Sequence, residues 1–538
     1  MILRNFLNFI LQFFKNSLHK FRNIYLNSNY YDKKISKIDN NNLIYKPSPH
    51  LLSSLIQYQK KKINIDEISI HDLWNEKNFK KLNNFYWFFS LDLKSSKKKA
   101  QLIISNWIEK NFKYNSKSWE FDLTSKRIIA WLSNHKLTCE NVDSSYQEQF
   151  NGMIQKQTNH LINEINNSKI IDDKIIGCAA IILVGICFKN GNNYLIYGLN
   201  LLKKISKLMF DNYGFPKSRN ISELVFYLKY FVLIREWFKE SQTEIPEHIN
   251  ETIYYLGQGY AFTWQNIGTD ILMNGNNLSN NYELDHYLKR FGYKFKNENK
   301  EFGGYAILQN KKISLVMDVG SSPLKKFSKN YQSGSLSFEI ISNGKKLISN
   351  CGYYYKNDLK LKELSKSTAA HSTLIIDDHS SCLYQKINKE TYNVINSLKI
   401  LKKNIIFEKN YWKINVSHNG YLKRYNSIHE REIEFYPDQF KFIGTDKILN
   451  KKSNFNIKFE IRFHLEPNVK LMKTQDNKTI LIELEDEGWK FTCDNFDINI
   501  DNGLYFGNKN SYIQNQNFFV SGITNKQEEN INWQIIKI

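Results

Sequence analysis

The sequence predicts a multidomain α+β protein in which an all-α half is followed by an all-β half. The chain has 538 residues, enough for two to four domains. Apolar residues recur at helical spacing between about residues 95 and 295, and the spacing changes to strand-like alternation from about residue 300. With 41% hydrophobic residues, such domains can bury their cores without staples. Disulfide-scaffold, collagen-like and fully disordered chains are therefore excluded.

The first 14 residues are rich in apolar side chains but are interrupted by polar ones. A membrane-spanning helix needs about 20 apolar residues, and no small-residue cleavage site follows, so neither a transmembrane helix nor a cleavable signal is predicted. We expect an amphipathic helix with Phe6, Ile10 and Phe13 or Phe14 on one stripe. It either docks on the protein, which we favour, or makes a peripheral membrane contact. The sequence does not identify the compartment and leaves it open between the bacterial cytoplasm and the cell envelope.

Seven segments of the first half carry the helical pattern: 100–112, 124–134, 146–167, 173–188, 193–211, 221–238 and 247–264. Short polar loops, such as residues 189–193, join them. Successive antiparallel helical hairpins build either a solenoid or a closed toroid. No repeat of fixed period is visible, which argues against a regular solenoid.

The second half contains short segments that alternate or are rich in β-formers: 314–319, 335–341, 402–408, 430–435, 440–443, 455–463 and 479–484. Asn-Gly turn signals occur at 342–344, 418–420 and 501–503. Many short strands over more than 200 residues predict a large antiparallel β-sandwich. The expected domains are an N-terminal helix and extension over 1–80, a helical domain over 81–298 and a sandwich over 299–538.

The net charge of +22 invites a nucleic-acid interpretation, because cationic side chains bind polyanions. The Lys runs are nevertheless short and scattered, and only nine of the 75 basic residues are Arg, which phosphate and base readers prefer. We therefore expect no nucleic-acid partner. The six cysteines form no CxxC pair and no zinc-like cluster, so we expect buried free thiols and no metal site.

Three stretches carry candidate chemistry. In 365–377, two alanines precede His371 and a β-run follows it, so the imidazole has small neighbours that leave room for a substrate. In 330–340, Tyr331 and Gln332 precede a strand where side chains can reach a ligand, and Glu339 is either a surface charge or a buried hydrogen-bonding group.

The third stretch is 213–223, where Gly214 and Pro216 end one helix and Ser218 or Asn220 caps the next. Capping explains Asn220. Arg219, a rare Arg in a Lys-dominated chain, indicates a bidentate contact with a carboxylate or sulfate.

These stretches resemble the heparinase II/III-like proteins in the order and spacing of several motifs together, over most of residues 80–538. The motifs are 127–131, 304–306, 334–339, 369–374, 418–421 with Arg424, 429–431 and 462–467. The resemblance implies an (α/α) toroid followed by an antiparallel β-sandwich. It also implies a polysaccharide lyase, a carbon–oxygen lyase without an organic cofactor, as the prototype activity.

In that family a uronic-acid-containing glycan is cleaved by β-elimination. A Tyr serves as base and acid, assisted by a His or Asn from the toroid and a His from the sandwich. The resemblance places His371 in the matching motif and suggests Asn220 as the neutralising amide. Tyr331 and Tyr260 both stay open as the catalytic Tyr. The substrate-binding candidates are Arg219, Gln332, Trp264, Asn274 and Glu339.

Two positions depart from the family pattern. Pro216 stands where relatives carry His, and Gln332 occupies a place where they often carry His. The sequence thus predicts a lyase of an acidic glycan. The alternative is a protein of glycan binding or cell-envelope polysaccharide assembly that does not cleave its ligand.

Overall fold

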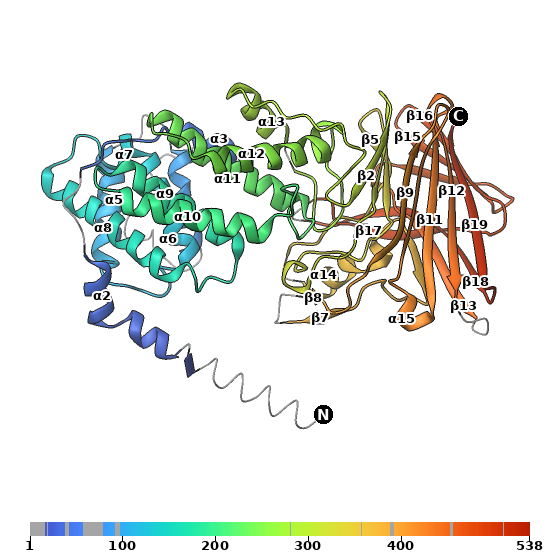
Figure 1. The fold of residues 1–538 in the computed structure, drawn as a ribbon, viewed down its shortest axis with the longest axis horizontal. Helices are drawn as coiled ribbons and strands as arrows, with labels where there is room; N and C mark the ends of the chain where they lie inside the picture. Colours follow the sequence, from blue (N-terminus) through green and yellow to red (C-terminus); the bar gives the residue numbers. More distant parts are fainter. Residues whose placement is uncertain are drawn as a thin grey trace. The chain divides into compact units, whose positions relative to one another are not determined.

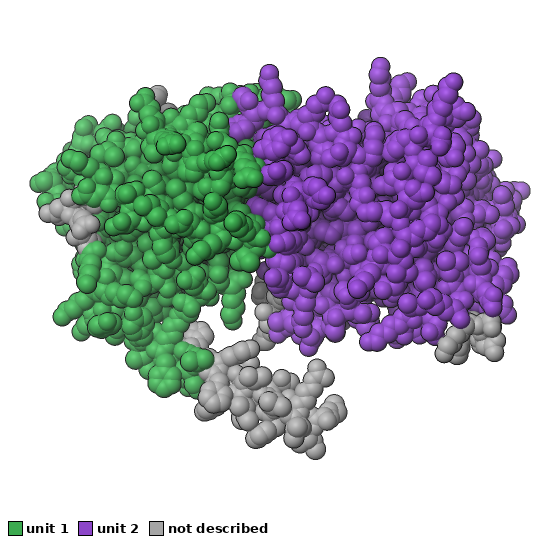
Figure 2. Space-filling model, in the orientation of Figure 1, with its two compact units in different colours: residues 1–208, 227–253, 283–291 green, residues 209–226, 254–282, 292–538 purple. Residues whose placement is uncertain are grey.

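The structure is a computed structural model that describes residues 17–18, 20–37, 42–56, 79–91, 97–279, 281–356, 358–387, 392–451, 456–508 and 511–538. The helix expected over residues 1–14 lies outside these residues. The chain divides into two compact units, coloured in Figure 2. Unit 1 comprises 1–208, 227–253 and 283–291, and unit 2 comprises 209–226, 254–282 and 292–538.

The first half of the chain is helical, as predicted (Figure 1). Each of the seven predicted segments overlaps a helix: α5 (Lys97–Lys110), α6 (Phe121–Ser133), α8 (Ser144–Glu164), α9 (Ile171–Cys187), α10 (Asn192–Met209), α11 (Ile221–Glu240) and α12 (Glu247–Tyr260). The last continues as the π-helical turn η4 (Ala261–Gln265). Additional helices are α2 (Asn29–Ile35), α3 (His50–Ile56), α4 (Phe79–Asn83), η3 (Tyr86–Ser90), α7 (His135–Thr138) and α13 (Asn281–Arg290). None of the helices in the described part is long and apolar enough to cross a membrane.

The core of unit 1 is built around a buried arginine on α6. Arg127 donates to the side chain of Gln157 at 2.7 Å and to the backbone carbonyl of Asn83 at 2.8 Å. Its guanidinium also lies 3.9 Å from the ring centroid of Trp107. A buried cation is tolerated only when its donors are satisfied, and carbonyl and amide oxygens satisfy it here. This arginine therefore orders the helices around it.

The second half forms antiparallel sheets. A five-stranded sheet has the order β1 (Glu301–Phe302), β2 (Tyr305–Gln309), β3 (Ile313–Asp318), β4 (Phe338–Ser342) and β5 (Lys345–Ile348). An eight-stranded sheet has the order β14 (Lys470–Lys473), β15 (Thr479–Leu484), β16 (Glu487–Cys493), β19 (Glu528–Lys537), β12 (Lys441–Asn450), β11 (Ser427–Tyr436), β10 (Trp412–His418) and β9 (Ile400–Phe407). A four-stranded sheet contains β17 (Ile498–Tyr505), β18 (Ile513–Thr524), β13 (Ile457–Phe463) and β6 (Leu374–Ile376), and β7 (Tyr384–Lys386) pairs with β8 (Tyr392–Val394).

One apolar cluster joins the three larger sheets into a β-sandwich. Strands such as β12 alternate buried and partly exposed residues, because successive side chains point to opposite faces of a sheet. The cluster draws on β3, β11 and β18 alike, through residues such as Leu315, Ile433 and Phe518. The predicted antiparallel sandwich is therefore confirmed.

Of the local turn signals in the sequence, one predicted its turn correctly and another did not. Residues 342–344 form the β4–β5 hairpin, with positive φ at Asn343 and Gly344, as a two-residue primed turn requires. The turn expected at 501–503 is wrong, because these residues lie inside β17 and pair continuously with β18. The strand expected from residue 335 begins only at Phe338, because Leu336 adopts a left-handed conformation with φ 61°.

Candidate functional site

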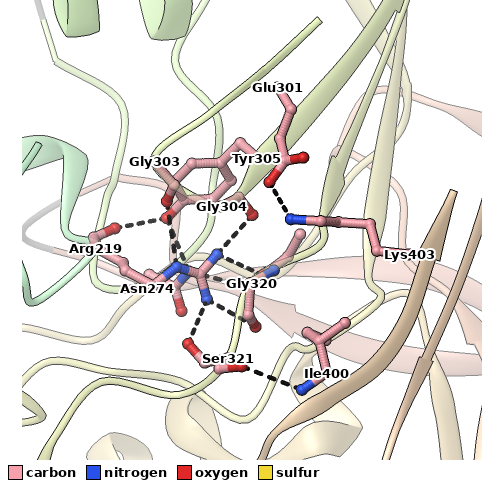
Figure 3. A network of polar contacts seen from close by, with 11 residues as sticks. Arg219, Asn274, Glu301, Gly303, Gly304, Tyr305, Gly320, Ser321, Ile400 and Lys403 are labelled. Carbon is pink, nitrogen blue, oxygen red and sulfur yellow. Dashed lines mark hydrogen bonds and ion pairs between the residues drawn. The ribbon is translucent and has the colours of Figure 1, made fainter. Parts of the chain in front are cut away.

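A buried polar network in unit 2 is centred on Arg219 (Figure 3). The residue lies in the turn before α11, with φ 60°. Its guanidinium donates to Asp318 at 2.6 Å and to four carbonyl oxygens, those of Gly303, Gly304, Gly320 and Ser321. Asp318 ends strand β3 and is 1% exposed. All five N–H groups of Arg219 are thus directed at protein oxygens, which leaves none for a substrate anion.

Two further residues complete this network. The side-chain amide of Asn274 donates to the Tyr305 hydroxyl at 2.8 Å and to the second oxygen of Asp318 at 2.9 Å. The Tyr305 hydroxyl donates in turn to the backbone oxygen of Arg219 at 2.6 Å. Burial is the main cause of a raised pKa at Tyr305, which keeps its phenol protonated. This network fixes the turn that presents the next residue, Asn220.

Asn220 is 1% exposed, and only one of the two polar atoms of its side chain has a hydrogen-bond partner. Its side-chain oxygen accepts from the backbone N–H of Glu223 at 3.2 Å, which is the expected N-cap of α11. Its Nδ2 has no hydrogen-bond partner although it is buried. A Cβ placed on Gly275 would lie 2.6 Å from that nitrogen, so only glycine allows the chain to approach it. Capping therefore leaves the side-chain amide N–H groups of Asn220 uncommitted.

Pro216 lies in a tight turn, residues 211–216, that contains no histidine. The Asp211 carboxylate accepts from the backbone N–H groups of Tyr213 and Phe215, both at 2.9 Å. Phe210 and Pro216 form an isolated antiparallel bridge. Bonds to backbone groups thus close the turn. Proline has no side chain that exchanges protons, so a proton acceptor at this site has to be another residue.

Gln332 and Glu339 are buried and fully engaged with the protein. The Gln332 amide accepts from the Gly275 N–H at 2.8 Å and donates to the carbonyls of Gly352 and Ser365, at 3.0 and 2.5 Å. Glu339 pairs with Lys346 at 2.9 Å, and burial is the main cause of its raised pKa. Gln332 therefore links the loop beside Asn220 to the turn that precedes His371.

His371 is 0% exposed and lies between η6 (Thr368–Ala370) and β6. Its Nδ1 lies 2.8 Å from the carbonyl oxygen of Ser367. Because a carbonyl can only accept, Nδ1 carries the proton and the neutral ring presents a lone pair at Nε2. Burial lowers the pKa of His371 to about 4, and Nε2 has no hydrogen-bond partner. The ring is thus a neutral, uncommitted proton acceptor at pH 7.

The two candidates for the catalytic tyrosine differ in the hydrogen bonding of their hydroxyl groups. The Tyr331 hydroxyl is buried without a hydrogen-bond partner, and burial followed by the nearby Cys382 and Asp318 raises its pKa. The Tyr260 hydroxyl donates to the carbonyl of Asn281 at 3.3 Å. Tyr260 also stacks on Trp264 with ring centroids 5.6 Å apart. Tyr331 therefore keeps a protonated and uncommitted phenol, whereas Tyr260 and Trp264 pack against each other.

Asp318 and Gly275 were not singled out by the sequence, whereas Gly334 was expected at a tight approach into a strand and Tyr305 lies in the 304–306 motif. Asp318 and Tyr305 hold Arg219 and Asn274, and Gly275 and Gly334 permit close approach to Asn220 and His371. The available signals were weak: an acidic residue at the end of the apolar run 314–318, and glycines beside polar residues. Arg219 was expected to bind a substrate anion, and its carbonyl partners, which no side-chain pattern reveals, favour a structural role.

Together these residues offer three uncommitted polar groups: an amide donor, a neutral imidazole and a protonated phenol. All three groups are buried without a hydrogen-bond partner. Such unpaired buried polar atoms are uncommon and costly in folded proteins. Both His371 and Tyr331 lie within electrostatic range of Asp318. An amide donor, a proton acceptor and a proton donor are the kinds of group that a reaction needs when it binds a carboxylate, removes one proton and supplies another.

The β-rich half of the chain is similar to a known protein family. Residues 300–534 match the family model described as Heparinase II/III-like, C-terminal. This confirms the resemblance expected from the sequence motifs over that part of the chain. No curated protein matches the chain.

Solved structures of similar fold cover nearly the whole chain. A heparinase III with methylated lysines is 14% identical, with a TM-score of 0.68 over 91% of this chain and 83% of that one. The heparan sulfate lyase HepC from Pedobacter heparinus is 12% identical, with a TM-score of 0.64 over 94% and 85%. Another heparinase III is 15% identical, with a TM-score of 0.66 over 98% and 91%. At these identities the likeness establishes the fold, a helical toroid and a β-sandwich.

Proposed function

We propose that this chain is a polysaccharide lyase that cleaves a uronic-acid-containing acidic glycan by β-elimination. The observation that carries the proposal is His371, whose Nδ1–H is held by Ser367 while its buried Nε2 has no partner. It lies inside the heparinase II/III-like region. A neutral imidazole with one fixed tautomer is the state that a general base needs at pH 7.

The first requirement of the reaction is a more acidic proton at C5 of the uronate. The uncommitted Nδ2–H of Asn220 donates to the substrate carboxylate and so stabilises the negative charge that develops on it. Its orientation is fixed beforehand, because Glu223 holds its oxygen and the Arg219 network holds its turn. Such preorganisation avoids reorganisation during the reaction.

The second requirement is a base and an acid in different protonation states. His371 accepts the C5 proton at Nε2, the C4=C5 double bond forms, and the bond between C4 and the leaving oxygen breaks. Tyr331, whose raised pKa keeps the phenol protonated, supplies a proton to that oxygen. The imidazolium then loses its proton and the phenolate regains one, which restores both groups.

The substrate class follows from charge and from the relatives. The solved structures of similar fold include proteins named heparinase III and heparan sulfate lyase. The net charge of +22 would raise the local concentration of any polyanionic glycan. We therefore place heparan-type glycans first in an assay panel, followed by alginate and bacterial capsular glycans.

The assay itself is the test of this proposal. Incubation of the purified protein with the panel is expected to produce new ultraviolet absorbance, because elimination leaves a C4=C5 double bond conjugated with the carboxylate. Mass spectrometry should show products whose masses add up to that of the substrate without added water. Absence of new absorbance across the panel, or products that contain added water, would exclude β-elimination of these glycans.

Gly334→Ala is expected to lower kcat about 100-fold with little loss of folding. A Cβ at this position would lie 2.5 Å from Cδ2 of His371, a contact that forces the imidazole to move. A displacement of about 1 Å can cost about 10²-fold in rate. Steady-state kinetics and a melting curve provide the measurement. Gly488→Ala on β16 is the control, since its Cβ would approach the exposed side chain of Ile538. Unchanged kcat in Gly334→Ala would argue against a catalytic His371.

A second candidate is a glycan-binding or envelope-assembly protein that does not cleave. Pro216 and the fully engaged Gln332 amide favour it, because the resemblance implies that His often stands at these two places and neither residue here can exchange a proton. Titration calorimetry with the same panel separates the candidates. Binding without turnover, and unaffected by His371→Ala, would favour the binding protein.

A further inference from the structure

Lys366, the last residue of α14 (Leu359–Lys366), is a buried lysine whose partners are backbone carbonyls. Its side chain is 2% exposed. Its Nζ donates to the carbonyl of Lys329 at 2.6 Å and to that of Tyr331 at 3.1 Å. A buried ammonium normally requires a carboxylate partner, so this arrangement calls for a physical reason.

The surroundings of the Lys366 amine are aromatic and cationic. Its Nζ lies 5.0 Å from the ring centroid of Tyr384 and 5.8 Å from that of Tyr353. The charged groups that act on it are Lys362 on the same helix and Lys329 on the facing segment. Burial, followed by these two lysines, lowers the pKa of Lys366 to about 7. A neutral amine keeps two hydrogens, enough for both carbonyls.

Lys366 belongs to a series of bonds that joins two segments of unit 2. The N–H of Ser333 donates to the Lys366 carbonyl at 2.9 Å, and the Thr368 hydroxyl donates to the Ser333 carbonyl at 2.8 Å. The Gln332 amide donates to the Ser365 carbonyl at 2.5 Å. Residues 329–333 and 365–368 are thus fastened to each other along their length, and the Lys366 amine supplies the bonds at the 329–331 end.

Each of these segments holds one of the uncommitted groups. Tyr331 lies in segment 329–333, and the Ser367 carbonyl in segment 365–368 fixes the tautomer and orientation of His371. We propose that Lys366 is a positioning residue that sets the Tyr331 phenol relative to the His371 imidazole. Its effect on catalysis rests on the proposed lyase function. Its effect on the two segments does not.

The test compares Lys366→Met with Lys360→Met. Lys360 is exposed on the same helix, so its replacement controls for loss of charge on α14. Hydrogen exchange of peptides covering residues 329–337 is expected to be faster in Lys366→Met and unchanged in Lys360→Met. On a cleaved glycan, Lys366→Met should lower kcat about 10- to 100-fold with KM nearly unchanged, because the groups are misplaced while the substrate still binds. Lys366→Gln, which keeps an N–H donor, should recover part of the rate.

The pH dependence of stability gives an independent readout. Because the folded pKa lies below the roughly 10.4 of an exposed lysine, the unfolded chain binds more protons between these two values. Wild-type Tm should therefore rise relative to that of Lys366→Met between pH 7 and pH 9, and the difference should stay constant below pH 7. The phenols of Tyr353 and Tyr384, whose rings lie beside the amine, have raised pKa values and stay protonated in this range.

The outcomes separate the two proposals. Unchanged exchange in residues 329–337 of Lys366→Met, or equal exchange in both Met variants, would overturn the positioning role. Faster exchange with undiminished kcat would also overturn it, because the segments would then move without affecting catalysis. If the wild type cleaves no glycan, the lyase proposal fails, while the exchange and Tm data still decide whether Lys366 fastens the two segments.

Discussion

Replacing His371 with alanine is expected to lower kcat/KM on the cleaved glycan by about 10³-fold or more. General-base catalysis typically contributes about 10²- to 10⁴-fold, and the buried Nε2 of His371 has no other partner. Stability should fall less, because the ring makes one backbone hydrogen bond, to Ser367. Ultraviolet kinetics and melting curves on the same preparations provide the measurement.

The matched control for this variant is His379→Ala. His379 lies in the same unit, where its Nδ1 is 2.6 Å from the Tyr425 hydroxyl. We expect this variant to keep near wild-type kcat. A His371→Ala protein that retains more than about a tenth of the wild-type rate would not fit a general base. Equal losses in the two variants would point to a general effect on folding.

The pH profile adds a second criterion. Burial lowers the pKa of His371 to about 4, so the ring stays neutral down to about that pH. The acid limb of kcat/KM that belongs to this base is therefore expected near pH 4, well below the usual value of about 6.5 for histidine. An acid limb near pH 6.5 that disappears in a variant of another residue would assign the base elsewhere.

The sequence was sufficient for features that depend on local periodicity. The helical segments and the β4–β5 turn were predictable because side-chain spacing and Asn-Gly conformational preferences act within a few residues. His371 was identified as a candidate because its small neighbours are adjacent in sequence, and its catalytic role stays a prediction. Asn220 was predictable as a cap, whereas its free Nδ2 depends on Gly275, which lies 55 residues away in the sequence.

The features that sequence reasoning missed depend on distant backbone groups. Asp501, Asn502 and Gly503 carry a turn signal, yet pairing with β18 outweighs that local preference. Arg219 was expected to contact a carboxylate or sulfate of a ligand, but the carboxylate it meets is that of Asp318, and its other partners are four carbonyls from two other loops. Lys366 looks like one of many surface lysines in the sequence, because carbonyl partners leave no side-chain signature.

Asp446→Leu is expected to give the largest loss of stability, about 3–5 kcal/mol in the free energy of unfolding. Asp446 on β12 is fully buried and accepts from both sides of Arg431 on β11, at 2.7 and 3.0 Å. It also accepts from His429 at 2.7 Å and from the Trp533 indole at 2.9 Å. Burial alone would raise its pKa, but Arg431 and His429 outweigh burial and lower it. Removing the carboxylate leaves the Arg431 charge buried without compensation.

This network also reaches the candidate site. The Nη1 atom of Arg431 donates to the carbonyl of Leu336 at 2.8 Å and to that of Ser372 at 2.7 Å. Ser372 follows His371 directly, and Leu336 holds a left-handed conformation two residues after Gly334. Arg431 thus fixes both stretches of backbone that enclose the His371 ring, from within the core of the sandwich.

The double variant Asp446→Leu/Arg431→Met separates these two roles. It removes the buried charge together with its partner, so much of the lost stability should return, because apolar replacements of buried ion pairs are often tolerated. Catalysis should stay low, since the carbonyls of Leu336 and Ser372 lose their common donor. Denaturant unfolding and kcat measured on both variants provide the test. A double variant that recovers stability and rate together would mean that Arg431 matters only as a charge to be neutralised. Recovery of stability alone would show that the arginine positions His371.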